Sequence, residues 1–322
     1  MPYKVPCKLN VFAALFVTGG AFHTAPAIAG DGPQELPVAG VVVISGSRVE
    51  HSSFDLPAAI DVVDAARIRD TQMRVNASES LNAVPGLVAQ NRQNYAQDLQ
   101  ISSRGFGARS AFGVRGVRLI ADGIPASMPD GQGQAATFNL DMAERIEVLR
   151  GPFSAIYGNH SGGVVQLFTR DGAGRPTVEF NMAAGSDGAR KIDINSQGEA
   201  GAVGYVIDAS RFDTDGYRAH SAARRDQAFA KLTTRPGASS RITVTASTLS
   251  QDDTQDPLGV TWATYQRDRR AGEIDLTDTQ EPKRTFAERY NTRKSIEHHQ
   301  LGLSFEQRFG EQVEILVLAA MD

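Results

Sequence analysis

The sequence predicts an exported protein in which a small α+β domain is followed by antiparallel strands of a transmembrane β-barrel. Three observations lead to this prediction. Residues 1–29 have the form of a secretory signal, residues 59–172 mix short strands and helical turns with many glycines, and residues from 175 onward alternate apolar and polar side chains. Short and long connections alternate between these segments, which is typical of outer-membrane barrels.

The N-terminal 29 residues carry the export signal. Lys4 and Lys8 precede or flank the start of an apolar stretch over residues 9–22, and Ala27, Ile28 and Ala29 have the small-residue pattern of a cleavage site. The stretch is shorter than the ~20 apolar residues that a membrane-spanning helix needs. We therefore expect cleavage after Ala29 rather than a membrane anchor.

Composition excludes several functions for the mature chain. The only cysteine, Cys7, lies in the signal peptide, so disulfides and thiol chemistry are excluded. Loss of Lys4 and Lys8 with the signal takes the net charge from −4 to −6, which leaves no basic excess for nucleic acid. No later apolar run reaches about 18 residues, so any membrane crossing must use strands. No catalytic or metal-ligand constellation is evident, and we predict neither an enzyme nor a metal or cofactor site.

Short elements are predicted along residues 59–172. Residues 59–63, 99–102 and 117–121 have the composition of strands, and Asn76 followed by Glu79 fits the start of a helix. Residues 144–170 form the unit that joins the two parts of the chain. In this unit Gly162 and Gly163 are expected to let two backbone segments approach closely, ahead of a buried strand over residues 164–168.

From residue 175 the pattern has a period of two, and about seven strands are predicted up to Asp322. A soluble β-sandwich would also alternate, so periodicity alone does not discriminate. The connections favour a barrel, because short ones near residues 199–202, 235–240 and 308–312 alternate with long ones over residues 213–225 and 250–289. The short gap at residues 185–188 departs from this trend.

Residues 30–58 form an arm around one β-prone run, Val41, Val42, Val43 and Ile44. Such a run in an exposed arm offers an edge to which a partner adds a strand. It is equally consistent with an ordinary first strand of the α+β domain.

Three blocks resemble the plug domain of TonB-dependent outer-membrane receptors. They are RGFG at residues 104–107, LIADGIP at residues 119–125, and RIEVLRGPFSAIYG at residues 145–158 followed by SGGVV at residues 161–165. Their order and spacing match as well. The resemblance covers residues 38–322, strongly over residues 59–172 and by pattern alone beyond them.

The resemblance implies a 22-stranded barrel with the plug folded inside it. It implies residence in the Gram-negative outer membrane, in contact with its lipid, and import of a scarce ligand, most often a ferric siderophore and sometimes haem, vitamin B12 or a sugar. The energy would come from TonB, which adds a strand to a motif that would be Val41 to Ile44 here. The chain then divides into a signal peptide (1–29), an arm (30–58), a plug (59–172) and a partial barrel (173–322).

The resemblance also implies roles for single residues. Arg104 and Arg150 would anchor the plug to glutamates on the barrel wall. Ligand contacts would come from two outward loops, because cations, amides and aromatic rings suit an anionic, partly aromatic ferric chelate; packing inside the plug is the alternative. The residues concerned are Arg109, Ser110, Phe112 and Arg115 in the first loop, and Met128, Asp130, Gln132 and Gln134 in the second.

About seven strands cannot enclose a plug, so we expect an incomplete barrel that does not transport by itself. A ligand-sensing module without transport is the rival function. Signalling receptors of this family carry an extra domain ahead of the TonB motif, and the short segment between Gly30 and Val41 argues against one here.

Overall fold

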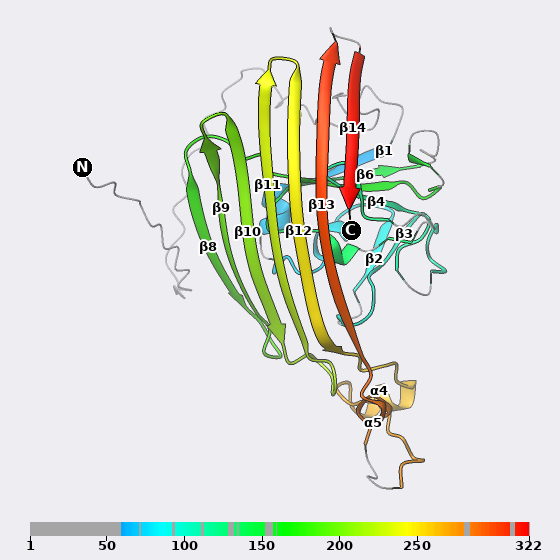
Figure 1. Cartoon of the computed structure of the whole chain (residues 1–322). Coiled ribbons are helices and arrows are strands. Elements are labelled where there is room, and N and C mark those ends of the chain that lie inside the picture. The colour runs from blue at the N-terminus through cyan, green and yellow to red at the C-terminus, as the bar shows by residue number, and fades with distance from the viewer. Residues whose placement is uncertain are drawn as a thin grey trace, which may run out of the picture. The chain divides into compact units, whose positions relative to one another are not determined.

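The computed structural model describes residues 59–70, 72–91, 94–110, 113–127, 132–133, 135–151, 157–158, 160–279, 284–309 and 313–321. The predicted signal peptide and the arm with Val41, Val42, Val43 and Ile44 lie outside these residues. Two parts follow each other along the described chain, an α+β domain up to residue 172 and a large antiparallel sheet (Figure 1).

The α+β domain is built on a five-stranded sheet with the order β1-β6-β7-β4-β5. β4 and β7 pair in parallel and the other neighbours are antiparallel. A second, two-stranded sheet and short helices complete the domain. The elements are β1 (Ala59–Asp64), α1 (Ala65–Arg69), α2 (Ser78–Leu81), β2 (Leu87–Gln90), β3 (Gln100–Ser103), β4 (Arg118–Ala121), β5 (Ile124–Pro125), η1 (Ala135–Thr137), β6 (Ala143–Arg150) and β7 (Val164–Thr169).

The core of this domain lies around β6 and β7, where Ile146 and Leu167 are at most 1% exposed. The predicted close approach at Gly163 is confirmed. Its φ of 112° lies in the region that favours glycine, and a Cβ atom there would come within 2.0 Å of the Leu149 carbonyl oxygen. Residues 152–156 of the same unit lie outside the described chain.

The second part is one antiparallel sheet whose seven strands follow chain order. They are β8 (Thr177–Ala184), β9 (Arg190–Ala200), β10 (Val203–Thr214), β11 (Ala223–Gly237), β12 (Ser240–Gln255), β13 (Arg293–Phe309) and β14 (Val313–Met321). The predicted number of strands is confirmed. The connection between β12 and β13, residues 256–292, contains α4 (Trp262–Arg267) and α5 (Phe286–Tyr290) and extends from one end of the sheet (Figure 1). We call it the outer loop.

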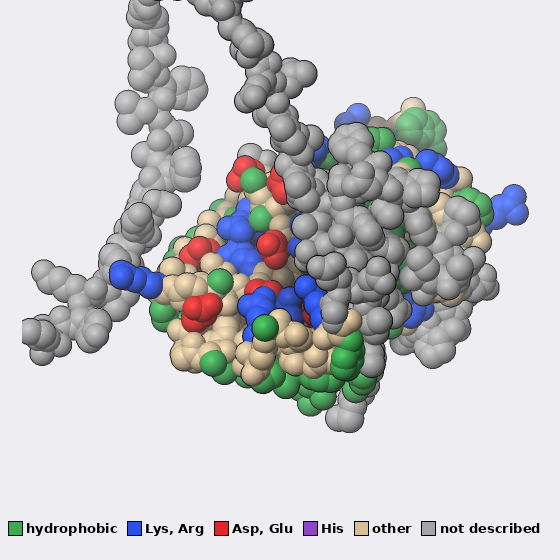
Figure 2. Space-filling model, turned by 90° about the horizontal axis from the view of Figure 1, so that it is seen from above, with side chains coloured by type: hydrophobic (Ala, Val, Ile, Leu, Met, Phe, Trp, Pro, Cys, Tyr) green, Lys and Arg blue, Asp and Glu red, His purple; other side chains and the backbone are tan. Residues whose placement is uncertain are grey.

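The exposure of the two faces of this sheet is the reverse of that in a soluble protein, because the apolar face is exposed and the polar face is buried. One face carries large apolar side chains that are exposed, among them Phe180, Met182 and Ile194 at 57%, 70% and 52%. The other face carries polar side chains that are buried, such as Asp193 and Asn195. Figure 2 shows hydrophobic side chains along the outer rim and charged side chains inside it. None of the helices in the described chain is long and apolar enough to cross a membrane.

Candidate ligand-binding site

The structure brings the two predicted ligand loops together. Val114 and Gly133 pair through two backbone hydrogen bonds of 3.1 and 2.7 Å, and Arg115 Nη2 donates to Gln132 Oε1 at 3.2 Å. Ser110 Oγ donates to the Gly113 carbonyl at 2.9 Å, and Arg109 is exposed. Phe112, Met128, Asp130 and Gln134 lie outside the described residues. Ligand contact by either loop stays a prediction.

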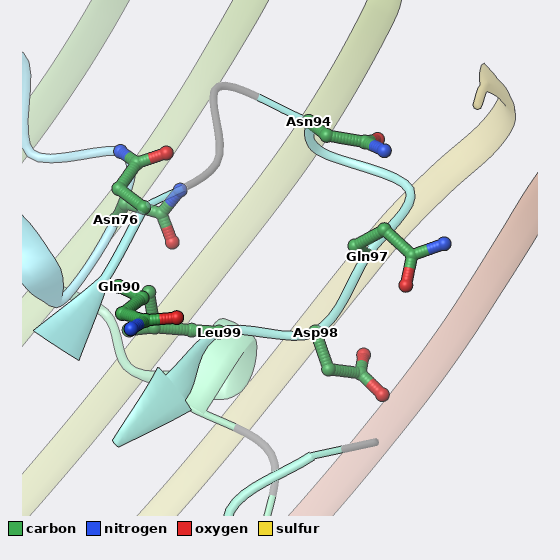
Figure 3. A pocket seen from close by; sticks show the side chains of 7 residues that line it. Asn76, Gln90, Asn94, Gln97, Asp98 and Leu99 are labelled. Carbon is green, nitrogen blue, oxygen red and sulfur yellow. The ribbon is translucent and has the colours of Figure 1, made fainter. Parts of the chain in front are cut away.

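A third loop, which joins β2 to β3, forms a polar pocket that the sequence analysis missed (Figure 3). Its lining contains five carboxamides, one carboxylate and one leucine. The residues are Asn76, Gln90, Asn91, Asn94, Gln97, Asp98 and Leu99. Carboxamides present both donors and acceptors without a net charge, and the cavity of about 10 Å³ has room for roughly one water-sized group, so the pocket suits a single oxygen atom of a ligand. The run of Asn and Gln just before the strand predicted over residues 99–102 was the available signal for this site.

The pocket loop is held by the sheet. Asn94 Nδ2 donates to Asp256 Oδ1 at 2.8 Å, and Gln97 Nε2 donates to the other oxygen of the same carboxylate at 2.5 Å. Asp98 forms an ion pair with Lys294 at 2.6 Å. Asp256 directly follows β12, and Lys294 lies in β13, so the two residues stand on the two sides of the outer loop. Hydrogen bonds therefore connect the polar pocket of the α+β domain to the base of the outer loop.

Tyr95 adds an apolar contact in the same loop. Its ring lies 5.1 Å from that of Phe212 in a tilted arrangement, and its carbonyl accepts from Gln251 Nε2 at 2.7 Å. Burial, assisted by the negative charge of Glu79, raises the pKa of the Tyr95 hydroxyl to about 12. Tyr95 is thus neutral at physiological pH, and its ring packs against Phe212 of β10.

A buried cluster of charges joins the α+β domain to β9. Asp141, 1% exposed, accepts from Lys191 Nζ at 2.7 and 2.8 Å and lies 3.1 Å from Arg74 Nε. Arg74 Nη2 also pairs with Asp193 at 2.8 Å. Each ion has an opposite charge within 3.1 Å, and Lys191 and Asp193 form further hydrogen bonds, as buried charges require. The cluster fixes the position of the domain against the polar face of the sheet.

A second cluster surrounds the segment between β7 and β8. Lys231 of β11 contacts Asp122 at 3.3 Å and Asp171 at 3.0 Å, and Arg241 of β12 contacts Asp171 at 2.5 Å. Burial raises the pKa of the Asp171 carboxyl, but the two cations outweigh burial, so that its pKa lies below the usual range. Asp122 also accepts from the backbone N–H of Thr169 at 2.9 Å.

Arg104 and Arg150 have other partners than those expected. Arg150 Nη2 pairs with Asp61 of β1 at 2.6 Å, and its Nη1 donates to the Pro85 carbonyl at 2.8 Å, so its partners belong to the α+β domain itself. Arg104 is exposed, and its backbone N–H donates to the Gly86 carbonyl at 3.0 Å. Within the described chain, ion pairs between domain and sheet instead use the two clusters above, the pair of Asp98 with Lys294, and a longer pair of Arg170 with Glu179 of β8 at 4.0 Å. Anchoring of Arg104 and Arg150 to barrel glutamates stays a prediction.

Comparison with known proteins supports a single architecture. The family model described as the TonB-dependent receptor plug domain matches residues 52–165. The chain is 23% identical over 164 residues to the vitamin B12 transporter BtuB of Vibrio vulnificus, which is 51% of this chain and 26% of that protein. It is 29% identical over 138 residues to a hemin receptor of Yersinia enterocolitica, which is 42% of this chain and 19% of that protein. These matches thus span about a quarter or less of the relatives' length.

Solved structures share the fold. The ferric yersiniabactin uptake receptor FyuA from Yersinia pestis superposes with a TM-score of 0.65 at 20% identity, over 82% of this chain and 40% of that one. The ferric citrate transporter FecA in its unliganded form gives a TM-score of 0.65 at 22% identity, over 87% of this chain and 42% of that one. The similarity therefore includes both the α+β domain and the seven-stranded sheet.

Proposed function

Because residues 52–165 match the family model of the TonB-dependent receptor plug domain, we propose that the chain is the plug and part of the barrel of an outer-membrane importer of ferric siderophores. Members of this family are transporters and not enzymes. The proposal for this chain concerns its location, its ligand and its source of energy.

The observation that carries the proposal is the reversal of the two faces of the seven-stranded sheet. Ile192 and Ile194 are 42% and 52% exposed, whereas Lys191 and Asp193 between and beside them are 5% and 1% exposed. In water such exposed apolar rows are costly, but in a lipid bilayer they are the stable arrangement of a barrel wall around a polar lumen. The charged inner face then meets the plug through the Asp141 and Asp171 clusters.

Three loops of the plug are candidates for the ligand contacts. The carboxamide pocket offers N–H donors for an oxygen atom of a chelate, and Arg109 and Arg115 of the neighbouring predicted loop supply positive charge. Ferric siderophores are commonly anionic complexes whose surface is rich in oxygen, which is the chemistry that these groups recognise.

TonB is the proposed partner. Its strand would pair with Val41, Val42, Val43 and Ile44 through main-chain hydrogen bonds. The chain would reach the outer membrane by way of the signal peptide over residues 1–29. Substitution of Val42 by Pro removes one backbone donor and interrupts such pairing, so uptake should be lost while ligand binding is retained.

Uptake of radioactive iron by cells that lack the gene tests the proposal. Ferric hydroxamate, ferric catecholate and ferric carboxylate complexes are supplied in turn to wild-type cells, to the deletion strain and to a strain without TonB. The proposal expects at least one complex whose uptake is lost in both mutants. Normal uptake of every ferric complex in the deletion strain would contradict it.

Import of haem or vitamin B12 is the second candidate, because the two curated relatives described above carry those names. The same strains discriminate, since growth on haem iron, or vitamin B12-dependent growth, would be lost in the deletion strain while uptake of ferric siderophores stayed normal. A receptor that only signals would leave uptake of all these ligands unchanged and alter transcription when ligand is added.

A further inference from the structure

Asp256 accepts hydrogen bonds from two of the five carboxamides that line the polar pocket. Both of its carboxylate oxygens are bound, one by Asn94 and the other by Gln97, and the side chain is 9% exposed. Both amides also line the pocket (Figure 3). An acidic side chain at the base of the outer loop thus accepts hydrogen bonds from the groups that a ligand oxyanion would use.

Asp256 is at the same time the first residue of the outer loop and closes its base. Its backbone N–H donates to the Thr292 carbonyl at 2.9 Å, and Thr292 Oγ1 donates back to the Asp256 carbonyl at 2.7 Å. Its carboxylate also accepts from the Leu258 N–H at 3.0 Å. On the opposite strand, Lys294 is held by Asp98 of the pocket loop. Residues 94–98 therefore fasten both sides of the base of the outer loop.

The described residues of the outer loop are also held by contacts that do not involve the pocket. Its α5 begins with a capping box formed by Thr285 and Glu288. Arg218 of the neighbouring connection donates to the carbonyls of Leu258 and Ala271, at 2.6 Å and at 3.2–3.3 Å. These contacts lie away from the pocket and do not depend on its amides.

We propose that Asp256 couples the carboxamide pocket to the outer loop, because an oxyanion of the ligand and the Asp256 carboxylate compete for the same N–H groups. Two negative groups cannot share the amides of Asn94 and Gln97 without repulsion in a partly buried site. Entry of an anionic ligand therefore expels Asp256 and releases the base of the outer loop. By reciprocity, a docked loop weakens ligand binding by the same factor. The inference rests on the proposed function, since it assigns regulation to the site proposed there.

Hydrogen exchange in the purified protein tests, without any ligand, whether the hydrogen bonds of Asp256 hold the base of the outer loop. Asp256→Asn places an amide opposite an amide, and exchange of backbone N–H groups over residues 258–279 should accelerate by about tenfold. The double variant D256N/Q97E exchanges donor and acceptor and should return the rate to within about threefold of wild type. Gln90→Ala, which alters the pocket at β2, is the matched control and should leave the loop unchanged. Equal exchange in D256N and wild type, or no rescue in the double variant, would overturn the coupling.

Ligand titration tests the competition. Ferric hydroxamate, catecholate and carboxylate complexes are the probes, and any probe that binds wild type should bind Asp256→Ala about tenfold more tightly and should accelerate loop exchange in wild type. Unchanged or weaker binding by the variant would overturn the proposal. Failure of every probe to bind would count against the proposed function, whereas the coupling would still be decided by the exchange of D256N and its rescue.

Discussion

Removal of the carboxylate charge of Asp141 should loosen the plug from the barrel wall. Asp141 is 1% exposed and neutralises Lys191, whose Nζ atom lies 2.7 Å from it, and it also contacts Arg74. In Asp141→Asn, Arg74 keeps Asp193 as its partner at 2.8 Å. Of its hydrogen bonds, Lys191 keeps the one to the Arg74 carbonyl at 3.0 Å. The substitution thus leaves a buried ammonium group without its main counter-charge.

The size of the effect follows from this loss. Breaking a buried ion pair by removing one partner typically costs about 3–5 kcal/mol, because the remaining charge stays desolvated. At 1.4 kcal/mol for each factor of ten, the population of the undocked plug should rise roughly 100- to 4,000-fold. Replacing both partners, in D141N/K191M, removes the orphaned charge and should recover most of that cost.

Thiol labelling measures this population, because the mature chain has no cysteine of its own. A single cysteine is introduced at Val206 of β10, which is 0% exposed and packs with Met142 of the plug, and its labelling rate is followed in detergent at increasing urea. Asp226→Asn, which removes an exposed ion pair with Arg211, serves as the control and should change the rate little. Labelling of D141N at the wild-type rate, or a double variant no slower than D141N, would refute the reasoning.

Three further predictions concern other parts of the chain. Gly163→Ala should destabilise the plug by about 3 kcal/mol or more, since the new methyl group meets the Leu149 carbonyl at a φ of 112°, and limited proteolysis of the plug would show it. His160 has a pKa below its usual value because of burial and the charge of Arg118, so the unfolded chain binds a proton that the folded one resists. Plug stability should therefore fall as the pH drops below about 6.5 and level off beneath the folded-state pKa; an NMR titration of His160 with a midpoint at or above 6.5 would contradict this. Ile194→Arg on the exposed apolar face should cost about 2–4 kcal/mol in urea-dependent unfolding from phospholipid vesicles, whereas an unchanged midpoint would argue against lipid contact there.

The sequence was informative about the sheet because its signals are local. Alternation at residues 178–182 and 192–194 specifies two faces, and the turn lengths specify how neighbouring strands connect. The structure adds which face is covered, with Phe180 and Ile194 exposed and Asp193 buried. Periodicity alone could not supply this, since it is identical for a sandwich and a barrel.

Contacts between segments that are distant in the sequence could not be predicted from the sequence. Asp141 and Lys191 are 50 residues apart, and Asp98 and Lys294 are 196 apart. Nothing in the sequence of one segment selects its partner in the other, so the ion pair of Arg150 with Asp61 was not predicted. The carboxamide pocket was missed for a related reason, since the residues that line it come together only in the folded chain.

The start of α2 differs slightly from the prediction, because the side chain of Glu79 binds backbone N–H groups ahead of the helix. Asn76 and Glu79 fit a capping pattern, yet the helix begins at Ser78 and Ala77 is its N-cap. The Glu79 carboxylate accepts from the backbone N–H groups of Arg74, Val75 and Asn76 at 2.8–3.0 Å. Three donors on one carboxylate fix a turn ahead of the helix, and Arg74 takes a positive φ of 58° within it.

The central claim is that the exposed apolar face of the seven-stranded sheet contacts lipid while its polar face covers the plug. Spin labels placed singly at residues 192–195 of β9 in the membrane-inserted protein test it most directly, by comparing collision with lipid-soluble oxygen and with a water-soluble nickel chelate. The account predicts strong oxygen access at positions 192 and 194 and protection from both reagents at positions 193 and 195. Access of the nickel chelate at positions 192 and 194, or the absence of any alternation, would contradict it.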